Sequence, residues 1–327
     1  MEGAEMKLSR VVAATLVVMF SSTAAAQYKW KWAHQVPVEE TQHLAALKFA
    51  GLVKDRTKGD IDVTVYPGST LGNDQQTINL VRGGTIEFAS SGSSNFNGIV
   101  AQTAVLELPF TFQDSKHAYR VLDGKVGQGL LDELGKHGMK GLAYFENGWR
   151  VFTNNRRPVR TPEDMKGLKV RTTPNPYHLQ AFQLLGTNPS PLPISELYSA
   201  LETKAFDAQE HPLPVLWSAK FFEVQKFATL TNHAYSPLIV VMNKAKFDAM
   251  PANYQKIVVD AAREAAQHQR ELNMQNEARI IAGLKKAGMQ VEQVDMAPFR
   301  AIVYEPVRKR FAEKNGMELL SAIDGEK

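Results

Sequence analysis

The chain has 327 residues, of which 44% are hydrophobic and 22% charged. This ordinary globular composition argues against intrinsic disorder and leaves room for two modest domains with separate cores. The formal net charge is +4 at pH 7 and there is no cysteine, so folding must depend on core burial and not on disulfides. No basic run is interleaved with aromatic residues, so nucleic acid is not an expected partner.

One apolar run is long, and it lies at the N-terminus. Lys7 and Arg10 precede the apolar segment Val11–Phe20, and an A-x-A cleavage site ends at Ala26. This is the pattern of a secretory signal peptide, and we assign it to residues 1–26. A membrane anchor is the alternative, but the run is short for a membrane span. We therefore expect cleavage between Ala26 and Gln27, and a mature protein that diffuses freely in a bacterial periplasm.

The mature chain opens with a strand–helix–strand pattern. YKWKWAHQV (Tyr28–Val36) alternates polar and apolar residues like a strand, a helical pattern follows over 41–54, and DIDVTVYP (Asp60–Pro67) alternates again. A further helix is expected over Asp74–Gly84 and a further strand at TIEFAS. This order of strands and helices indicates an α/β fold with a mostly parallel sheet covered by helices.

A second series of the same kind starts at the long strand-like run Met139–Asn154. It continues with a proline-rich turn, the strand KVR (Lys169–Arg171) and the helices PYHLQAFQLLG and SELYSALETK, before the apolar strand Ser236–Asn243. No low-complexity linker separates the two series, which favours several chain crossings between two domains. We predict a first domain over residues 27–148 plus 237–276 and a second domain over residues 149–236 plus 277–327.

The longest helical pattern starts at Pro251 and meets no breaker before Gly283. Its apolar positions are irregular and rich in alanine, which does not fit a coiled-coil seam. One interpretation is a single long helix that touches both domains. The other is a pair of helices with a kink near Asn273–Asn276.

Motifs of catalysis and metal binding are not found in the sequence. It has no H-E-x-x-H, no G-x-S-x-G and no nucleophilic cysteine, and its eight histidines do not pair at metal-ligand spacing. We therefore expect no catalytic residue, no metal and no cofactor, and a protein that is not an enzyme. His34 and His211 follow strand-like or helix-end segments, where loops carry binding groups, although each also fits a hydrogen-bonded structural role.

Two arginines indicate a binding site more strongly than the histidines do. Arg150 and Arg171 each end a strand-like run in the second series, and ligands of open α/β sheets bind at the carboxyl ends of strands. The planar guanidinium matches a carboxylate bidentately and keeps its charge. One interpretation is that both arginines face a carboxylate ligand. The other is that each pairs with an internal acid, for which Glu146 and Asp164 are nearby candidates.

At this point several motifs resemble one family, the dicarboxylate-type (DctP-like) solute-binding proteins of tripartite ATP-independent periplasmic (TRAP) transporters. The resemblance covers nearly the whole mature chain. It is carried by these segments in this order: YKWKWAH, VYPGSTLGND, LPFTF, NGWRVFTNNRRPVRTPEDMKGLKVRTTP, LPISELYSALETKAFDAQEHP, FFEVQKFATLTNHAY and MPANYQKIVVDAAREAA.

The resemblance implies a two-domain periplasmic-binding-protein clamshell, with a long helix spanning both domains, that closes on a small organic acid. It implies that Arg171 forms a salt bridge with the ligand carboxylate, that Arg150 assists, and that His34 and Asn95 line the site from the first domain. A motif that usually reads Q-E-N-P ends in His211-Pro212 here. Histidine can donate to the carboxylate through one ring nitrogen or, if protonated, add positive charge.

Three aromatic residues are candidates for an apolar or stacking wall of the site: Trp149, Phe96 and Trp217. Core packing is the alternative for each of them. The ligand stays open among a C4-dicarboxylate, a uronate or other sugar acid, and a hydroxy or oxo monocarboxylate.

The resemblance implies a periplasmic receptor, expected to be a monomer, that delivers this acid to the membrane permease subunits of a TRAP transporter. An exported enzyme that uses the two arginines as an electrostatic clamp on a carboxylate substrate is the alternative. Its only candidate general bases are His211 and Glu210. The binding protein of an ATP-driven importer is a third interpretation with the same clamshell shape.

Overall fold

The computed structural model of the protein describes residues 26–326. The predicted signal peptide, apart from its last residue, therefore lies outside the described residues. None of the helices in the described range combines the length and the apolar character needed to cross a membrane.

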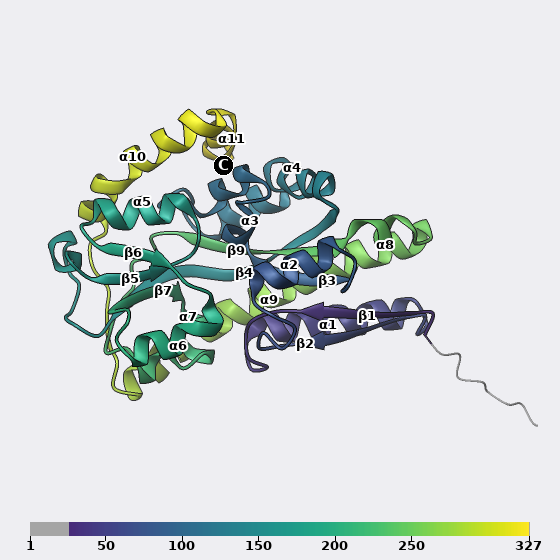
Figure 1. Cartoon of the computed structure of the whole chain (residues 1–327), viewed down its shortest axis with the longest axis horizontal. Helices are drawn as coiled ribbons and strands as arrows, with labels where there is room; N and C mark the ends of the chain where they lie inside the picture. The colour runs from purple at the N-terminus through teal and green to yellow at the C-terminus, as the bar shows by residue number, and fades with distance from the viewer. Residues whose placement is uncertain (1–25, 327) are drawn as a thin grey trace, which may run out of the picture.

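The described chain folds around a mixed sheet of ten strands. The strands are β1 (Tyr28–Ala33), β2 (Ile61–Tyr66), β3 (Phe88–Gly92), β4 (Met139–Asn154), β5 (Lys169–Thr172), β6 (Asn188–Pro191), β7 (Ala208–Pro212), β8 (Phe227–Thr229), β9 (Tyr235–Asn243) and β10 (Gln290–Glu292). Their order is β2-β1-β3-β9-β4-β7-β5-β6, while β8 pairs with β4 and β10 pairs with β8. Figure 1 shows β1–β3 and β5–β7 on opposite sides of the molecule, with β4 and β9 between them.

The outer strands of each half pair in parallel, as the alternation of strands and helices predicts. β1 pairs with β2 and β3, and β5 pairs with β6 and β7, all in parallel. The two central strands differ, because β9 is antiparallel to β3 and β4, and β4 is antiparallel to β7. The sequence pattern did not indicate this antiparallel centre.

Strand β4 belongs to both halves of the sheet. It pairs with β9 as far as Trp149, and from Arg150 onward it pairs with β7. The register with β9 shifts beside Gly148, whose φ is 113°, a conformation that favours glycine. A Cβ atom at Gly148 would lie 3.4 Å from Cβ of Pro212 in β7. This bend turns the strand from one half to the other and places Arg150 at the junction.

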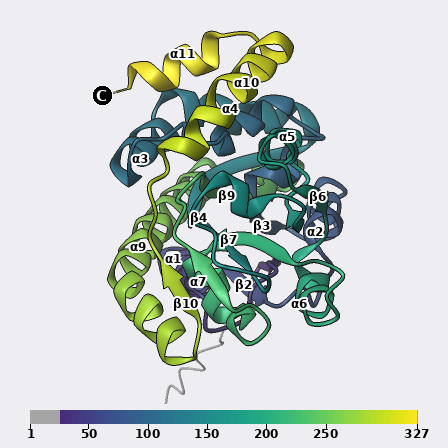
Figure 2. The same ribbon diagram turned by 90° about the vertical axis from the view of Figure 1, so that its left-hand side faces the viewer.

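Helices cover both halves of the sheet (Figures 1 and 2). They are α1 (Thr41–Arg56), α2 (Asp74–Arg82), α3 (Ser115–Asp123), α4 (Lys125–Glu133), α5 (Pro176–Leu184), α6 (Ile194–Glu202), α7 (Leu213–Ser218), α8 (Lys244–Asp248), α9 (Ala252–Lys286), α10 (Ala297–Asn315) and α11 (Glu318–Gly325). Short 3-10 helices include η1 (Ser93–Phe96) and η2 (Ala101–Glu107). The helices predicted from the sequence are confirmed as α1, α2, α5, α6 and α9.

The long helical pattern is one helix, α9, of 35 residues. The alternative of two helices with a kink near residues 273–276 is therefore wrong. Figure 2 shows α9 running along one side of the molecule. Its first half packs Val258 and Ala262 into the core around β1 and β9, whereas Ile280 and Leu284 belong to a separate core around α6 and α7. One helix thus contributes to the cores of both halves, as predicted.

The C-terminal helices also contact both sides of the molecule. Helix α10 packs against α5, and α11 packs against α4. The ring nitrogen Nε2 of His117 in α3 lies 3.0 Å from the carbonyl oxygen of Ile323 in α11. The division into two domains at the residue boundaries given above stays a prediction.

The first turn of α1 contains a buried acid that makes stability depend on pH. Glu40 is the N-cap of α1 and accepts hydrogen bonds from the Gln42 backbone at 2.5 Å and from the Thr41 hydroxyl at 3.1 Å. Burial raises the pKa of Glu40 from 4.5 to about 7, although these hydrogen bonds oppose the shift. The native state therefore holds a proton that the unfolded chain releases at lower pH.

We expect Glu40→Gln to stabilise the protein at pH 8 but not at pH 5. Because the native pKa of Glu40 is raised, its contribution to the free energy of unfolding is fully present below the unfolded pKa. That contribution is lost as pH rises through about 7. The difference between the two pH values should be on the order of 2 kcal/mol, measured by urea denaturation of both proteins. The exposed Glu271→Gln is the control. An equal effect of Glu40→Gln at both pH values would contradict this account.

Candidate ligand-binding site

A cavity of about 350 Å³ lies where the two halves of the sheet meet. The half that contains β1 and β3 contributes Gln35 and Ser91 to its lining, and the half that contains β5 and β7 contributes Arg171 and His211. Each of these residues lies in a strand or within two residues of the end of one, and open α/β sheets bind ligands at the ends of their strands.

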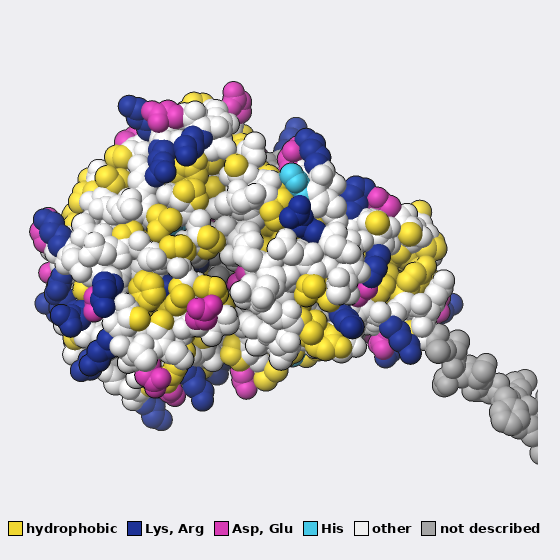
Figure 3. Space-filling view, in the orientation of Figure 1, with side chains coloured by type: hydrophobic (Ala, Val, Ile, Leu, Met, Phe, Trp, Pro, Cys, Tyr) yellow, Lys and Arg dark blue, Asp and Glu magenta, His cyan; other side chains and the backbone are white. Residues whose placement is uncertain are grey.

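Positive charge in this cavity is buried and does not belong to the charged surface. On the face drawn in Figure 3, most Lys and Arg side chains lie around the outer edge of the molecule, and few lie near its centre. Within the cavity, Arg171 is 4% exposed and Arg150 is 1% exposed. Because the surrounding dielectric is low, these two guanidinium groups act on a ligand more strongly than surface cations would.

Arg171 is the cation of the cavity whose charge is not paired. Its Nε and Nη2 donate to the carbonyl oxygen of Leu192 at 2.8 and 2.5 Å, and its Nη1 lies 3.2 Å from Nε2 of His211. It forms no ion pair with a carboxylate of the described residues. Burial lowers the pKa of Arg171 to about 10, although Glu210 raises it. The group stays protonated at neutral pH, and an entering anion would offset its desolvation.

His211 is held as a neutral imidazole that supports Arg171. Its Nδ1 lies 2.5 Å from Oε1 of Gln209, and Gln209 uses its Nε2 to donate to Thr153 at 2.8 Å. The Gln209 oxygen can only accept, so Nδ1 of His211 carries the proton and Nε2 accepts from Arg171. Burial lowers the pKa of His211 well below its usual value, and the neighbouring Arg171 adds to the effect. The positively charged alternative considered from the sequence therefore does not fit.

Arg150 lines the same cavity, but internal acids occupy its guanidinium. Its Nε and Nη2 donate to the two carboxylate oxygens of Glu210, and Nη2 also donates to the Glu210 carbonyl oxygen at 2.6 Å. Its Nη1 donates to Ser236 at 3.1 Å and lies 3.6 Å from Glu107. Burial would raise the pKa of Glu210, but Arg150 holds it well below its usual range. The internal partners are Glu210 and Glu107, so the candidates Glu146 and Asp164 were wrong.

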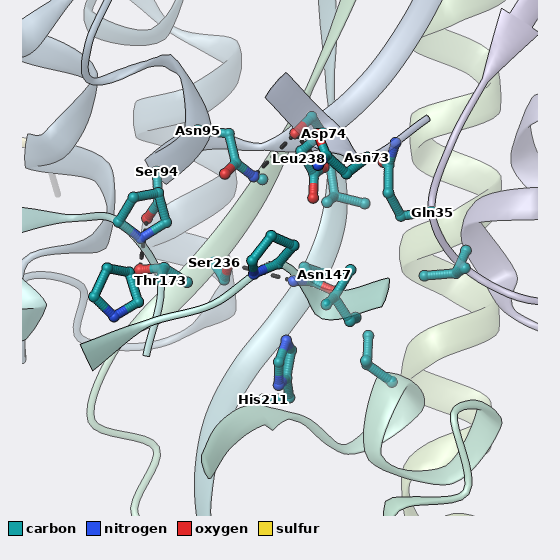
Figure 4. Close-up of a pocket in the computed structure, with 18 of the residues that line it drawn as sticks. Gln35, Asn73, Asp74, Ser94, Asn95, Asn147, Thr173, His211, Ser236 and Leu238 are labelled. Atoms are coloured by element: carbon teal, nitrogen blue, oxygen red, sulfur yellow. Dashed lines mark hydrogen bonds between the residues drawn. The ribbon is translucent and has the colours of Figure 1, made fainter. Parts of the chain in front are cut away.

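The opposite side of the cavity contains an acid, Asp74, in the first turn of α2. This turn begins with a capping box, in which Asn73 and Gln76 each accept a hydrogen bond from the other's backbone nitrogen. Oδ1 of Asp74 accepts from the Ser91 hydroxyl at 2.5 Å, and Ser91 in turn accepts from Nδ2 of Asn95 at 3.0 Å. Figure 4 shows Asp74 and Asn95 on one side of the cavity and His211 on the other.

The sequence-predicted residues divide into two groups. Four of them line the cavity: Arg171, Arg150, His211 and Asn95. The other four lie outside its lining: His34, Phe96, Trp149 and Trp217.

Each residue of the second group has another environment. His34 is buried, with Nε2 lying 3.0 Å from Nδ1 of His43, and Phe96 is buried in the core. Trp149 donates to Ser115 at 2.9 Å and lines a second cavity beside α10. Trp217 stacks on Phe222. Phe96 is therefore a core residue, and Trp149 and Trp217 are half-buried side chains that pack against the cores.

Sequence reasoning did not single out most of the polar lining. Gln35, Gln42, Asp74, Asn147 and Ser236 line the cavity but were not predicted. A signal existed for some of them, because Gln35 follows the first strand and Ser236 begins the apolar strand of the second series. Among residues 26–326, no group of three or more His, Cys, Asp or Glu side chains could hold a metal ion.

Comparison with known proteins gives a consistent family match. The chain matches the family described as bacterial extracellular solute-binding protein, family 7 (DctP), over residues 32–314. It is 46% identical to the 2,3-diketo-L-gulonate-binding periplasmic protein YiaO of Escherichia coli (strain K12), over 98% of this chain and 99% of the relative.

Two solved structures have a similar fold. A TRAP periplasmic solute-binding protein from Polaromonas sp. JS666, bound to D-erythronate, has a TM-score of 0.89 at 36% identity and covers 92% of this chain and 99% of that chain. One from Sulfurospirillum deleyianum, with bound succinate, has a TM-score of 0.88 at 30% identity and covers 92% and 100%. These structures confirm the α/β binding-protein fold that was predicted from the sequence.

Proposed function

The chain belongs to family 7 of the bacterial extracellular solute-binding proteins, the binding proteins of TRAP transporters, and from this membership we propose that it captures a small organic acid and delivers it to a TRAP transporter. The relatives above bind 2,3-diketo-L-gulonate, D-erythronate and succinate. All three ligands carry a carboxylate, which supports an organic acid as the ligand of this chain.

One observation carries the proposal. Arg171 is a buried guanidinium that faces the cavity without an ion-pair partner among the described residues. A carboxylate matches its planar fork, and the hydrogen bonds to Leu192 and His211 already hold the side chain in place. The site is therefore pre-organised for one carboxylate, which reduces the entropic cost of binding.

The position of the cavity supports a cleft between two domains that close on a ligand. We propose the domain division 27–148 plus 237–276 and 149–236 plus 277–327. The contacts that join the proposed domains beside the cavity include a hydrogen bond from the Thr173 hydroxyl to the Ser94 hydroxyl at 3.3 Å and one from Nε2 of His178 to the Glu107 carbonyl oxygen at 2.6 Å. Contacts of this kind would form as the cleft closes on a ligand.

The proposal includes the compartment and the oligomeric state. The relative from Escherichia coli is a periplasmic protein by name, and the N-terminal signal pattern agrees with export. We propose that the chain is cleaved between Ala26 and Gln27 and acts as a monomer in the periplasm.

The alternative, an exported enzyme acting on a carboxylate, finds less support in the site. Both ring nitrogens of His211 are occupied, and Glu210 is bound to Arg150. Neither candidate general base is free to take a proton from a substrate. Incubating the purified protein with a bound acid and recovering that acid chemically unchanged would favour the receptor over the enzyme.

A thermal-shift screen with a library of organic acids tests the proposed function. A ligand present at about 100 times its Kd should stabilise the protein by about 2.7 kcal/mol, which raises Tm by roughly 4 °C for a chain of this size. The same acid should leave the Tm of Arg171→Ala unchanged. A library in which no carboxylate shifts the Tm, or an equal shift for Arg171→Ala, would contradict the proposal.

A further inference from the structure

The cavity is lined by charged side chains of both signs. The lining contains two guanidinium groups, Arg150 and Arg171, and two carboxylates, Asp74 and Glu107. Arg150 is already bound to Glu210, and His211 is neutral. Within the described lining, Arg171 is thus the cation left to neutralise an entering anion. A ligand with one carboxylate can form an ion pair with Arg171. A second carboxylate on the same ligand would have no further unpaired cation in this lining to bind.

The two acids that line the cavity differ in whether they have a carboxylate oxygen that can still accept a hydrogen bond from a ligand. Both carboxylate oxygens of Glu107 accept hydrogen bonds, Oε1 from Ser93 and Ser94 and Oε2 from Ser236. Asp74 accepts at Oδ1 from Ser91, while its Oδ2 accepts no hydrogen bond from another described residue. Asp74 is therefore the lining acid with an oxygen available to a hydrogen-bond donor of the ligand.

The surroundings of Asp74 favour a hydroxyl as that donor. Six amide side chains line the cavity, and they can donate to and accept from hydroxyl groups: Gln35, Gln42, Asn73, Gln75, Asn95 and Asn147. Burial raises the pKa of Asp74, although the hydrogen bond from Ser91 and the charge of Arg171 oppose the shift. A ligand hydroxyl that donates to Oδ2 would further compensate this negative charge, whereas a carboxylate at the same place would be repelled.

We propose that Asp74 is a specificity-determining residue that accepts a hydrogen bond from a ligand hydroxyl and rejects a second carboxylate. The inference rests on the proposed function and deepens it. Figure 4 shows Asp74 and Asn95 on the side of the cavity opposite His211, the residue that is bonded to Arg171. A ligand whose carboxylate binds Arg171 would therefore extend its carbon chain toward Asp74 and Asn95. The ligand class is then a hydroxylated monocarboxylate, such as an aldonate, in preference to a dicarboxylate.

Matched acids test this inference by calorimetric titration. Each pair should differ only in a terminal CH₂OH or carboxylate: threonate with tartrate, gluconate with glucarate, and galactonate with galactarate. We expect at least one aldonate to bind tenfold or more tightly than its dicarboxylate partner. In Asp74→Asn, which has the same shape without the charge, this ratio should fall about tenfold, through weaker aldonate binding and stronger dicarboxylate binding.

The control variant is Asp114→Asn, an aspartate at the start of α3 that caps the His117 backbone outside this cavity. It should leave the aldonate-to-dicarboxylate ratio unchanged, and the melting temperature of each variant will show that it is folded. The inference is overturned if dicarboxylates bind the wild type as tightly as aldonates, or if Asp74→Asn keeps the wild-type ratio. If acids bind but Arg171→Ala binds them equally well, the proposed function fails instead. If no acid binds, both are overturned.

Discussion

Arg171→Ala is expected to abolish ligand binding while the fold is retained. The substitution removes the cation of the cavity that has no ion-pair partner among the described residues, so a bound carboxylate would be buried without compensation. Losing one partner of a buried charge pair costs about 2–5 kcal/mol, or roughly 30-fold to several thousand-fold in affinity. Stability should fall little, because Arg171 is bonded to Leu192 and His211 and not to an acid. Calorimetry with an acid from the thermal-shift screen measures the affinity.

Two further variants separate charge from geometry. Arg157→Ala removes an arginine that also donates to backbone carbonyl oxygens, at Asp164 and Lys166, but lies outside the cavity lining. It should leave the affinity unchanged. Arg171→Lys keeps the charge but loses the bidentate fork, so we expect an intermediate loss. Wild-type affinity in Arg171→Ala would show that the carboxylate binds elsewhere.

Arg150→Met is expected to destabilise the fold by about 3–5 kcal/mol, because it leaves a buried carboxylate without its partner. Glu210 is fully buried and receives two side-chain hydrogen bonds from Arg150 across β4 and β7. Removing Arg150 therefore forces Glu210 to stay charged without its partner or to take up a proton. Urea denaturation measures the loss, which should become smaller at acid pH, where Glu210 is more easily protonated.

Arg160→Met is the matched control for Arg150→Met. Arg160 also binds both oxygens of one carboxylate, Glu292, but its side chain is 65% exposed. Exposed pairs contribute little because water screens them, so no clear change in stability is expected. A stable Arg150→Met protein that has lost its ligand would mean that Arg150 serves the ligand and not the fold.

Much of the fold could be predicted because local patterns determine it. The alternation of YKWKWA places Trp30 and Trp32 on the buried face of β1, and the unbroken pattern after Pro251 is the single helix α9. The antiparallel centre could not be predicted in this way. It depends on how β4 and β9, which are almost a hundred residues apart in places, pair across the middle of the sheet.

The same dependence on local patterns explains which residues of the site could be predicted from the sequence. Arg171 could be found because it ends a strand, a feature that is local in sequence. The partner of Arg150 could not, because Glu210 is 60 residues away and meets it only through the antiparallel register of β4 and β7. Asp74 was not singled out as a site residue, although it ends the segment VYPGSTLGND, because an acid in the first turn of a helix is usually explained by the helix dipole alone.

A crystal structure of the protein with its acid bound tests the central claim most directly. The account predicts both carboxylate oxygens within hydrogen-bond distance of the Arg171 guanidinium, with Arg150 still bound to Glu210 and His211 still bonded to Gln209. A ligand whose carboxylate lies away from Arg171, or which has drawn Arg150 off Glu210, would contradict the account.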